Sequence, residues 1–457
     1  MNFPGLIFLL IAHYLCGRSI LKLFQVQITL VSEICLSLMV GVPVLSLVPC
    51  LLQLLHIPII LSSVNFGILA LTIILCIPML LDFKRPRFPR ITLPYIYEWP
   101  FIIIFLILIS VSVWRCFYYP PIARDMLSGP ELLAEYTVRE MTMINSVFTV
   151  DLQTTNNYFK SPFITGLQII YKLLVSPFGQ LWLSIISLSF IAWLYTLLRV
   201  RVHPLIAGVL LLSFITAPDI YAYTYLMLYD YSNMVFFFCG FYFLTCYFSG
   251  NNIRDFIFSA FLFGIATYIR TETLVLVAML LPLPAFYYYR KRFPLIKSML
   301  YLALFLLIPA AFYVLCMNVF VHNFIPVSLD LGKELNPHPG DISAFFFRLS
   351  DMTTKLIFSF AGIRVYGYFV FFFLLVLFVD LVWLRKFNRE AILALYGIAV
   401  VYTGLAFLGY LLPLVDLTNT TKRGLFKMLP IMLFYMTNSP TLIFLSDKIN
   451  KWADALK

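Results

Sequence analysis

The chain has 457 residues, 62% of them hydrophobic and only 12% charged, and its mean hydropathy is +0.95. This composition excludes a soluble globular protein and predicts a polytopic integral membrane protein. The formal net charge of +11 comes from basic residues at the ends of apolar runs rather than from one patch. We therefore expect membrane lipids, and no nucleic acid, among its partners.

Apolar runs long enough to cross a ~30 Å hydrocarbon core recur along the whole chain. Because strands would leave backbone groups unpaired in lipid, these runs must form helices packed in a bundle. We predict an all-α integral membrane protein with about thirteen transmembrane helices. Their expected positions are residues 4–17, 26–53, 65–82, 98–115, 178–198, 203–217, 232–248, 255–269, 272–289, 296–321, 366–384, 390–413 and 424–445.

Basic residues in the connections orient these helices, because Lys and Arg collect in cytoplasmic loops. Clusters such as Lys84–Arg90 and Arg385–Arg389 place the N-terminus outside and the C-terminus in the cytoplasm. On this basis residues 1–95 form about three N-terminal membrane helices with a basic cytoplasmic linker. Residues 96–445 form a larger membrane module, and residues 446–457 form a cytoplasmic tail.

Two long segments, near residues 115–179 and 322–365, are expected on the non-cytoplasmic side. The first contains the polar sequence RDMLSGPELLAEYTVREM (residues 124–141), although ionisable residues are costly in membrane proteins unless they have a role. It also contains an apolar helix near residues 161–174, too short to span the bilayer, which we expect at the membrane interface. Functional residues concentrate on long loops beside a rigid scaffold, so we expect the active site to begin here.

The eight cysteines are scattered, almost all inside apolar runs, and contain no CxxC pair. We expect them to be buried apolar residues. No group of residues has the spacing of metal ligands, and we predict a protein that uses neither a metal nor another cofactor.

Several short motifs between residues 98 and 445 resemble those of the C-type-fold (GT-C) membrane glycosyltransferases, the superfamily of protein O-mannosyltransferases and lipid A aminoarabinose transferases. The acidic loop that begins at Asp125 is followed by FKSP, one residue different from the Lys-Pro-Pro-like element of that family. YDYSN resembles a segment in which an acidic residue, here Asp230, opens a span. IRTET is similar to an Arg-Pro-Glu turn with Thr271 in place of proline, and TKRGLFKMLP to an Arg-Tyr…Pro element with Gly424 in place of tyrosine.

Enzymes of this kind move a sugar, with inversion, from a polyprenyl-phosphate carrier to a glycan, lipid or protein acceptor outside the cytoplasm. The resemblance implies such a glycosyltransferase in a bacterial inner membrane, with its active site on the periplasmic face. The reaction needs a carboxylate as general base for the acceptor hydroxyl. It also needs fixed positive charge for the leaving phosphate.

The residues that match the family motifs supply these groups. Asp125 is the expected general base, and Glu131 is the alternative. Contacts to the donor phosphate are expected from Lys160, Arg270, Arg423 and Lys427, and further substrate contacts from Glu272, Asp230, Lys422 and His338.

Structural roles are open for the same residues. Asp125 beside Arg124 is also explained by a loop ion pair, and Arg270 two residues before Glu272 by a salt bridge. Asp230 at the head of a span is also typical of a helix cap.

The remaining basic and acidic candidates have ordinary explanations as well. Lys160, Arg423 and Lys427 are typical of residues that anchor helices at a membrane interface. Glu135 and Glu140 are expected to be structural, as the polar face of a helix in which Glu135 pairs with Arg139 one turn later.

Two other functions remain open. A non-catalytic transporter or flippase for lipid-linked saccharides would show internal repeats and charged residues at mid-membrane depth. No repeat is visible in the sequence, and Asp380 is the nearest such charge. A glycan polymerase or ligase would instead use a lipid pyrophosphate donor.

Overall fold

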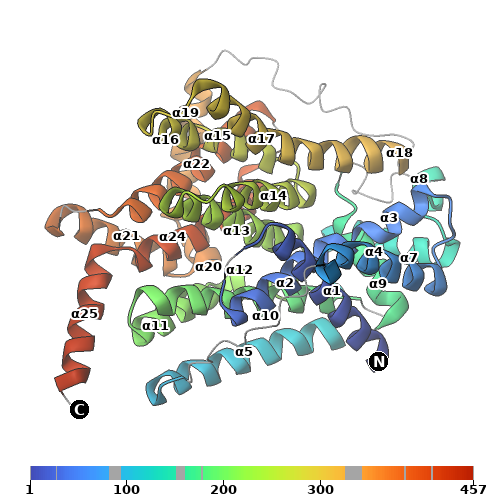
Figure 1. Cartoon of the computed structure of the whole chain (residues 1–457), viewed down its shortest axis with the longest axis horizontal. Coiled ribbons are helices and arrows are strands. Elements are labelled where there is room, and N and C mark those ends of the chain that lie inside the picture. The colour runs from blue at the N-terminus through green and yellow to red at the C-terminus, as the bar shows by residue number, and fades with distance from the viewer. Residues whose placement is uncertain are drawn as a thin grey trace.

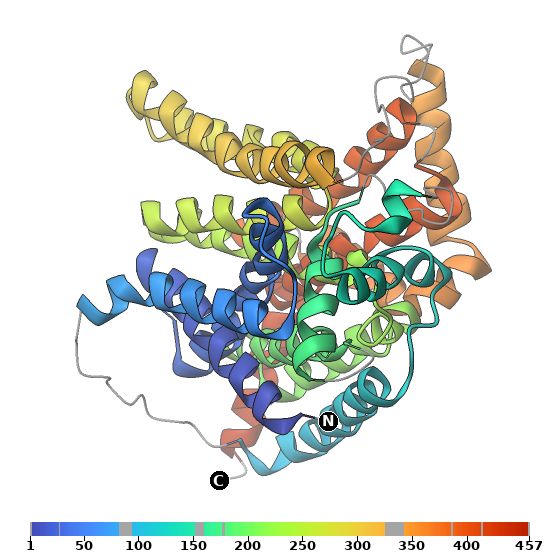
Figure 2. The ribbon, with the colours of Figure 1, turned by 90° about the vertical axis from the view of Figure 1, so that its right-hand side faces the viewer.

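Helices form the architecture of the computed structural model. No strand occurs among the residues that it describes, which are 2–26, 28–81, 94–150, 160–175, 179–324, 342–384, 387–412 and 415–455. The N-terminal and C-terminal helices lie on opposite sides of helices from the middle of the chain (Figures 1 and 2). The prediction of an all-α fold is confirmed.

Helix bounds follow the predicted spans, with breaks that hydropathy did not indicate. The first half of the chain contains α1 (Phe3–Leu23), α2 (Leu30–Leu45), α3 (Leu47–Leu54), α4 (Leu61–Leu81), α5 (Trp99–Tyr118), α6 (Arg124–Leu127), α7 (Pro130–Glu140), α8 (Ser146–Thr149), α9 (Phe163–Leu174), α10 (Leu181–Arg201), α11 (Pro204–Ile215) and α12 (Pro218–Ala222). The second half contains α13 (Tyr229–Gly250), α14 (Ile253–Ile269), α15 (Thr273–Leu280), α16 (Pro282–Arg290), α17 (Leu295–Val314), α18 (His322–Phe324), α19 (Ile342–Asp351), α20 (Phe360–Tyr366), α21 (Phe369–Val379), α22 (Arg389–Leu411), α23 (Lys422–Gly424), α24 (Met428–Thr437) and α25 (Pro440–Ala455).

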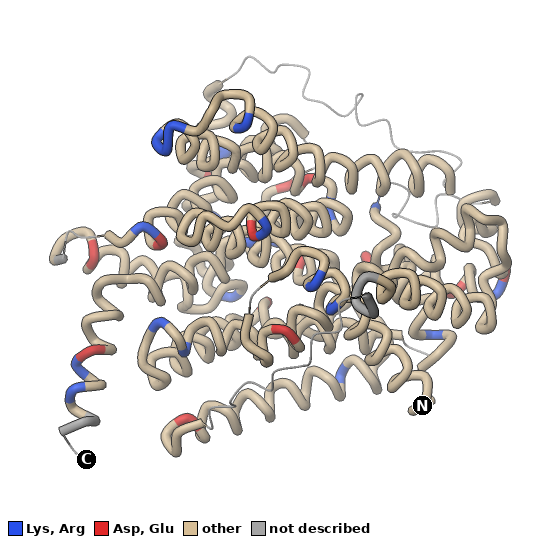
Figure 3. The backbone as a smooth tube through the Cα atoms, viewed as in Figure 1, with Lys and Arg blue, Asp and Glu red and all other residues tan. Residues whose placement is uncertain are grey.

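Eight of the described helices are long and apolar enough to cross a membrane, and ten are if each of two sharply bent pairs counts as one span. Lys, Arg, Asp and Glu lie mainly at helix ends and connections, with long uncharged stretches between them (Figure 3). These features confirm the predicted polytopic membrane character. A helix occupies each of the thirteen predicted positions, but some, such as α11, are shorter than a span requires. The count of thirteen therefore stays a prediction.

Glycines bring the backbones of α1 and α2 into direct contact. A Cβ atom on Gly17 would lie 1.8 Å from the carbonyl oxygen of Ser37, and one on Gly41 would lie 2.0 Å from that of His13. Small residues at helix crossings allow such close approach in membranes, where packing replaces the hydrophobic effect as the driving force. Any side chain at Gly17 or Gly41 would force the two helices apart.

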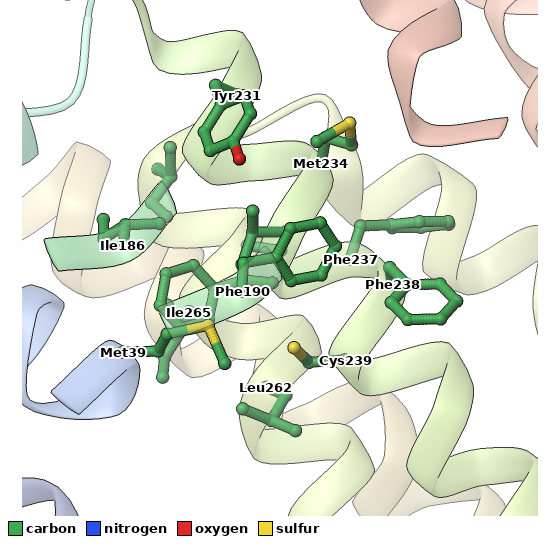
Figure 4. Packing of buried hydrophobic residues seen from close by; sticks show 14 of the residues in the cluster. Met39, Ile186, Phe190, Tyr231, Met234, Phe237, Phe238, Cys239, Leu262 and Ile265 are labelled. Atoms are coloured by element: carbon green, nitrogen blue, oxygen red, sulfur yellow. The ribbon is translucent and has the colours of Figure 1, made fainter. Parts of the chain in front are cut away.

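The central core joins the N-terminal helices to the rest of the bundle. Figure 4 shows Met39 of α2 near Phe190 of α10, in one cluster with Phe237 and Phe238 of α13 and Leu262 of α14. All five side chains are buried. Because α2 contributes to this core, the first helices and the central helices share one packed interior.

The N-terminal helices also hold the end of α7. The Gln53 side chain, at the end of α3, accepts hydrogen bonds from the Met143 backbone N–H at 2.6 Å and from the Thr142 hydroxyl at 3.0 Å. The Ile59 N–H, just after α3, donates to the carbonyl oxygen of Met141 at 2.8 Å. The segment that follows the acidic helix is thus fixed by residues from the start of the chain.

The apolar helix that we expected at the membrane interface is instead enclosed by protein. Every residue of α9 except Lys172 and Leu173 is buried, and α9 packs against α7, α3 and α10. An interfacial helix would leave one face open to lipid and headgroups. The expectation was wrong because helix length excludes a span without indicating what covers the helix, and here α7 from the same loop covers it.

Asp380, the charge that the sequence placed within a span, has a structural role. It follows α21 and is fully buried. Its carboxylate accepts hydrogen bonds from the Tyr435 hydroxyl at 2.7 Å and from the Thr441 N–H and hydroxyl at 3.0 and 2.6 Å. Asp380 therefore caps the start of α25 and ties it to α21 and α24.

Replacing Asp380 should destabilise the bundle. Asp380→Ala leaves the buried donors of Tyr435 and Thr441 without an acceptor, which costs about 1–3 kcal/mol for each unsatisfied group. We expect a lower thermal unfolding temperature for this variant in detergent. Asp447→Ala, at an exposed position of α25, is the control and should unfold like the wild type. Equal unfolding temperatures for the two variants would contradict the capping role.

Candidate functional site

Charged side chains from four separate parts of the chain form one set of interacting groups. It consists of two groups of ion pairs, an inner one and an outer one, and Arg423 of the outer group interacts electrostatically with Asp230 of the inner group. The side chains come from α6, from the head of α13, from the turn between α14 and α15, and from α23 and the turn that follows it. We call this set the charged cluster, and its members are Asp125, Asp230, Arg270, Glu272, Arg423 and Lys427.

Arg270 is the centre of the inner part of the charged cluster. Its guanidinium donates to the carboxylate of Asp230, and its Nε lies 3.0 Å from Oε1 of Glu272. Lys427 Nζ lies 3.7 Å from the same Glu272 oxygen. The side chain of Lys427 is only 1% exposed and that of Asp230 only 3%. Buried charges are tolerated when opposite charges and hydrogen bonds compensate them, and here each cation has a carboxylate partner.

Local backbone structure explains why the side chains of Arg270 and Glu272 lie next to each other. Helix α14 ends at Ile269, and the Thr273 N–H donates to the carbonyl oxygen of Arg270 at 3.0 Å, which makes a tight turn before α15. The salt bridge between Arg270 and Glu272, left open as a structural alternative, is present. It also extends to Asp230, forty residues earlier in the sequence.

Asn233 fixes this turn from the side. Its side-chain Nδ2 donates to the carbonyl oxygen of Ala266 at 2.7 Å and to the Thr273 hydroxyl at 2.9 Å. Asn233 is fully buried and lies one helical turn after Asp230 on α13. These two residues of α13 therefore hold the break between α14 and α15 at two points.

The outer part of the charged cluster joins α6 to α23. Arg423 Nη1 donates to Oδ2 of Asp125 at 2.9 Å, across 298 residues of sequence. Partial burial alone would raise the pKa of Asp125, but the hydrogen bond and charge of Arg423, with the charge of Lys160, hold that pKa below its ordinary value. Asp125 is thus a carboxylate at neutral pH, as a general base requires.

Lys160 lies between the two parts of the charged cluster. It precedes α9 and interacts electrostatically with Asp125, Arg270, Arg423 and Asp230. Burial lowers the pKa of Lys160, and the nearby carboxylate of Asp125 opposes this effect. The four residues predicted to contact a donor phosphate are therefore brought together around one set of carboxylates.

Asp219 lies beside the charged cluster and was not singled out from the sequence. Its carboxylate is 3.9 Å from Lys422 Nζ, and the Lys422 carbonyl oxygen accepts a hydrogen bond from the Tyr366 hydroxyl at 2.7 Å. Burial raises the pKa of Asp219, and this effect outweighs the charges of Lys422 and Arg423, which lower it. An aspartate that follows a proline is typical of an ordinary helix start. The sequence around Asp219 therefore did not indicate a functional residue.

Glu131 makes different contacts from Asp125. Its carboxylate lies 2.6 Å from Lys172 Nζ and accepts a hydrogen bond from Gln168 Nε2 at 2.6 Å. The predicted pair of Glu135 with Arg139 is confirmed at 2.9 Å. The contacts of Glu131 with Lys172 and Gln168 fasten α7 to α9. The role of Glu131 as an alternative base stays a prediction.

His338, the remaining predicted contact, lies outside the described residues. Within the described parts of the chain, no three His, Cys, Asp or Glu side chains are grouped so that they could hold a metal ion. The chain matches no protein-family model, no curated protein and no solved structure.

Removing the Asn233 side chain should loosen the turn that carries Arg270 and Glu272. In Asn233→Ala the backbone amides of residues 270–275 should exchange with solvent faster than in the wild type, because two buried hydrogen bonds are lost. Hydrogen-exchange mass spectrometry measures this. Asn252→Ala removes the cap at the opposite end of α14 and should leave residues 270–275 unchanged. Equal exchange in both variants would show that Asn233 does not hold the turn.

Proposed function

We propose that the protein is a membrane glycosyltransferase that transfers a sugar from a polyprenyl-phosphate donor to a glycan, lipid or protein acceptor. The observation that carries the proposal is the convergence of Asp125, Lys160, Arg270 and Arg423. Each was expected at the active site because of a separate motif resembling the GT-C family, and the four motifs span about 300 residues. The site would face the periplasm of a bacterial inner membrane, as the orientation predicted from the basic loops requires.

The basic members of the charged cluster suit a phosphate group. Arg guanidiniums can bind two phosphate oxygens at once, and Lys adds a compact charge. In this site Asp230 and Glu272 hold Arg270 in a fixed orientation before a ligand arrives. Such preorganised charge stabilises the negative charge that develops on a leaving phosphate more effectively than water does.

The balance of charge favours a donor with one phosphate. The charged cluster together with Lys160 carries four positive and three negative formal charges, from Lys160, Arg270, Arg423, Lys427, Asp125, Asp230 and Glu272. The resulting net charge of +1 matches the single negative charge of a glycosyl phosphodiester. A pyrophosphate diester carries two negative charges, so this balance argues against the polymerase or ligase alternative.

Asp125 is suited to remove the acceptor proton. The acceptor hydroxyl transfers its proton to the Asp125 carboxylate while its oxygen attacks the anomeric carbon of the sugar. The bond between that carbon and the phosphate oxygen breaks, and the leaving phosphate monoester gains one negative charge. Arg423 now pairs with Asp125, so a donor phosphate that binds Arg423 also frees a carboxylate oxygen for the acceptor.

The buried charges support a transporter less than they support an enzyme. Asp380 is satisfied by Tyr435 and Thr441. Glu98, which is also fully buried, pairs with Arg199 at 2.9 Å. Both carboxylates have structural partners, whereas a transport pathway needs charged groups that can exchange partners as the substrate moves.

Asp125→Asn should abolish transfer and preserve donor binding. Loss of a general base typically lowers the rate by about 10²–10⁴-fold, and Asn keeps the size of the side chain. Purified protein in nanodiscs is tested with a panel of radiolabelled polyprenyl-phosphate sugars, and both transfer and donor binding are followed. Asp447→Asn, at an exposed site on α25, is the matched control. Full activity of Asp125→Asn would remove Asp125 as the base, and no binding of any donor by the wild type would overturn the proposed function.

Neutralising Glu272 should relax the preference for a single phosphate. Glu272→Gln raises the net charge of the site by one, which favours a ligand with one more negative charge. We expect the ratio of affinities for a polyprenyl pyrophosphate sugar and a polyprenyl phosphate sugar to rise about tenfold, equivalent to about 1.4 kcal/mol. The control is Glu135→Gln, which removes the same charge from the α7–α9 contact. An unchanged ratio in Glu272→Gln would show that charge balance does not select the donor.

A further inference from the structure

Three polar groups beside the charged cluster form no hydrogen bond with any residue that the structure describes. They are the carboxylate of Asp219, the hydroxyl of Tyr223 and the ammonium of Lys422. Asp219 lies in α12, Tyr223 follows that helix, and Lys422 begins α23. By contrast, the carboxylates of Asp125 and Asp230 each accept a hydrogen bond from an arginine. The three groups are therefore polar atoms of this region that can still bind a ligand.

Local structure brings the three groups together. The Tyr223 N–H donates to the carbonyl oxygen of Asp219 at 2.9 Å, and residues one helical turn apart lie on the same face. The ring of Tyr223 packs edge-on against Phe426, with the ring centroids 4.9 Å apart. Lys422 Nζ lies 3.9 Å from Oδ2 of Asp219, and the Tyr366 hydroxyl holds the backbone of Lys422. The end of α12 and the start of α23 thus present their polar groups to one place.

The polar ends of these side chains are accessible. The side chains of Asp219 and Lys422 are 27% and 29% exposed. Tyr223 is only 6% exposed as a whole, yet its hydroxyl oxygen is not enclosed. A nearly buried tyrosine usually places its hydroxyl beside a hydrogen-bond partner. The Tyr223 hydroxyl has none among the described residues, and it therefore marks a position where a bound molecule can donate or accept a hydrogen bond.

These groups adjoin the place where the proposed reaction occurs. Tyr223 interacts electrostatically with Asp219 and also with Asp230 and Arg423 of the charged cluster. Asp219 in turn interacts with Arg423, which pairs with the expected base Asp125. A molecule that contacts Asp219 and Tyr223 is thus next to the carboxylate that would remove the acceptor proton.

The chemistry of the three groups favours a neutral ligand with several hydroxyls. The carboxylate of Asp219 would repel an anion, and the ammonium of Lys422 would repel a cation. A hydroxyl can donate to the first and accept from the second. A serine, a threonine or a long-chain alcohol has one hydroxyl, and that hydroxyl is the nucleophile at Asp125. A sugar has further hydroxyls on adjacent carbons, which leaves some for these groups.

We propose that Asp219, Tyr223 and Lys422 form an acceptor subsite that takes a saccharide. One hydroxyl of the sugar lies at Asp125, while its neighbours donate to Asp219, accept from Lys422 and share a hydrogen bond with Tyr223. The inference rests on the proposed function for the reaction that the acceptor undergoes. It narrows the acceptor from a glycan, a lipid or a protein to a saccharide, either a free glycan or the head of a glycolipid.

The test measures binding and does not require sugar transfer. Methyl glycosides of glucose, galactose, mannose and N-acetylglucosamine are titrated against the full-length protein in nanodiscs by saturation-transfer NMR, and at least one should bind. A diacylglycerol that carries the bound sugar is then added to the nanodisc membrane. Competition by this lipid identifies the head of a glycolipid as the ligand, and lack of competition identifies a free glycan. Both results support a saccharide.

Substitutions that keep side-chain shape test the subsite itself. Asp219→Asn should weaken methyl glycoside binding about tenfold, because a hydrogen bond to a carboxylate is stronger than one to an amide. Tyr223→Phe keeps the ring against Phe426 and should weaken binding several-fold. The matched control is Asp351→Asn, which removes the same charge from an aspartate–lysine pair in α19 and should bind the sugar like the wild type.

The proposal is overturned if no methyl glycoside binds to the wild type, or if Asp219→Asn and Tyr223→Phe both bind the sugar as the wild type does. It is also overturned if a threonine-containing peptide binds and loses affinity in Asp219→Asn, because the subsite then takes a protein. If the sugar binds as expected but the wild type transfers nothing from any polyprenyl-phosphate donor, only the proposed glycosyltransferase function fails.

Discussion

Compensation of charge inside an apolar bundle is the constraint on which the rest of this structure depends. Arg270 lies between Asp230 and Glu272, and the nearly inaccessible Lys427 shares Glu272 with it. Because an uncompensated charge in such a setting costs several kcal/mol, the head of α13, the α14–α15 turn and the start of α24 are held in fixed relation to one another. The same pairs that stabilise the bundle keep the basic groups oriented toward a shared centre.

The segment from α6 to α8 is fixed to this centre from two directions. Arg423 holds Asp125 from the C-terminal end of the chain, while Gln53 and α9 hold α7 and the residues after it from the N-terminal side. The N-terminal helices therefore have a clear structural role. They support the segment that follows the expected base, through the hydrogen bond from the Met143 backbone to Gln53.

Hydropathy predicted the helical architecture, because exclusion of unpaired backbone from lipid leaves few alternatives. It did not predict short helices outside the apolar runs, such as α12, or breaks within them, such as that between α15 and α16. Contacts between residues close in sequence could also be predicted. The Glu135–Arg139 pair follows from helical spacing, and the Arg270–Glu272 pair from a two-residue separation in a turn. Contacts between distant segments were not. Nothing in the local sequence indicated that Arg423 reaches Asp125, and family resemblance suggested only that both belong to one site.

The 298 residues between Asp125 and Arg423 have a consequence for biosynthesis. At about 5–20 residues per second, a ribosome needs roughly 15–60 s to reach Arg423 after it has made Asp125. Once α10 has been made, less than a third of the way through that interval, the N-terminal helices and α9 can already assemble, since their partners α2, α3, α7 and α10 are all present. The segment that carries Asp125 is therefore in place before Arg423 is made, and a chain released early from the ribosome lacks the ion pair between them.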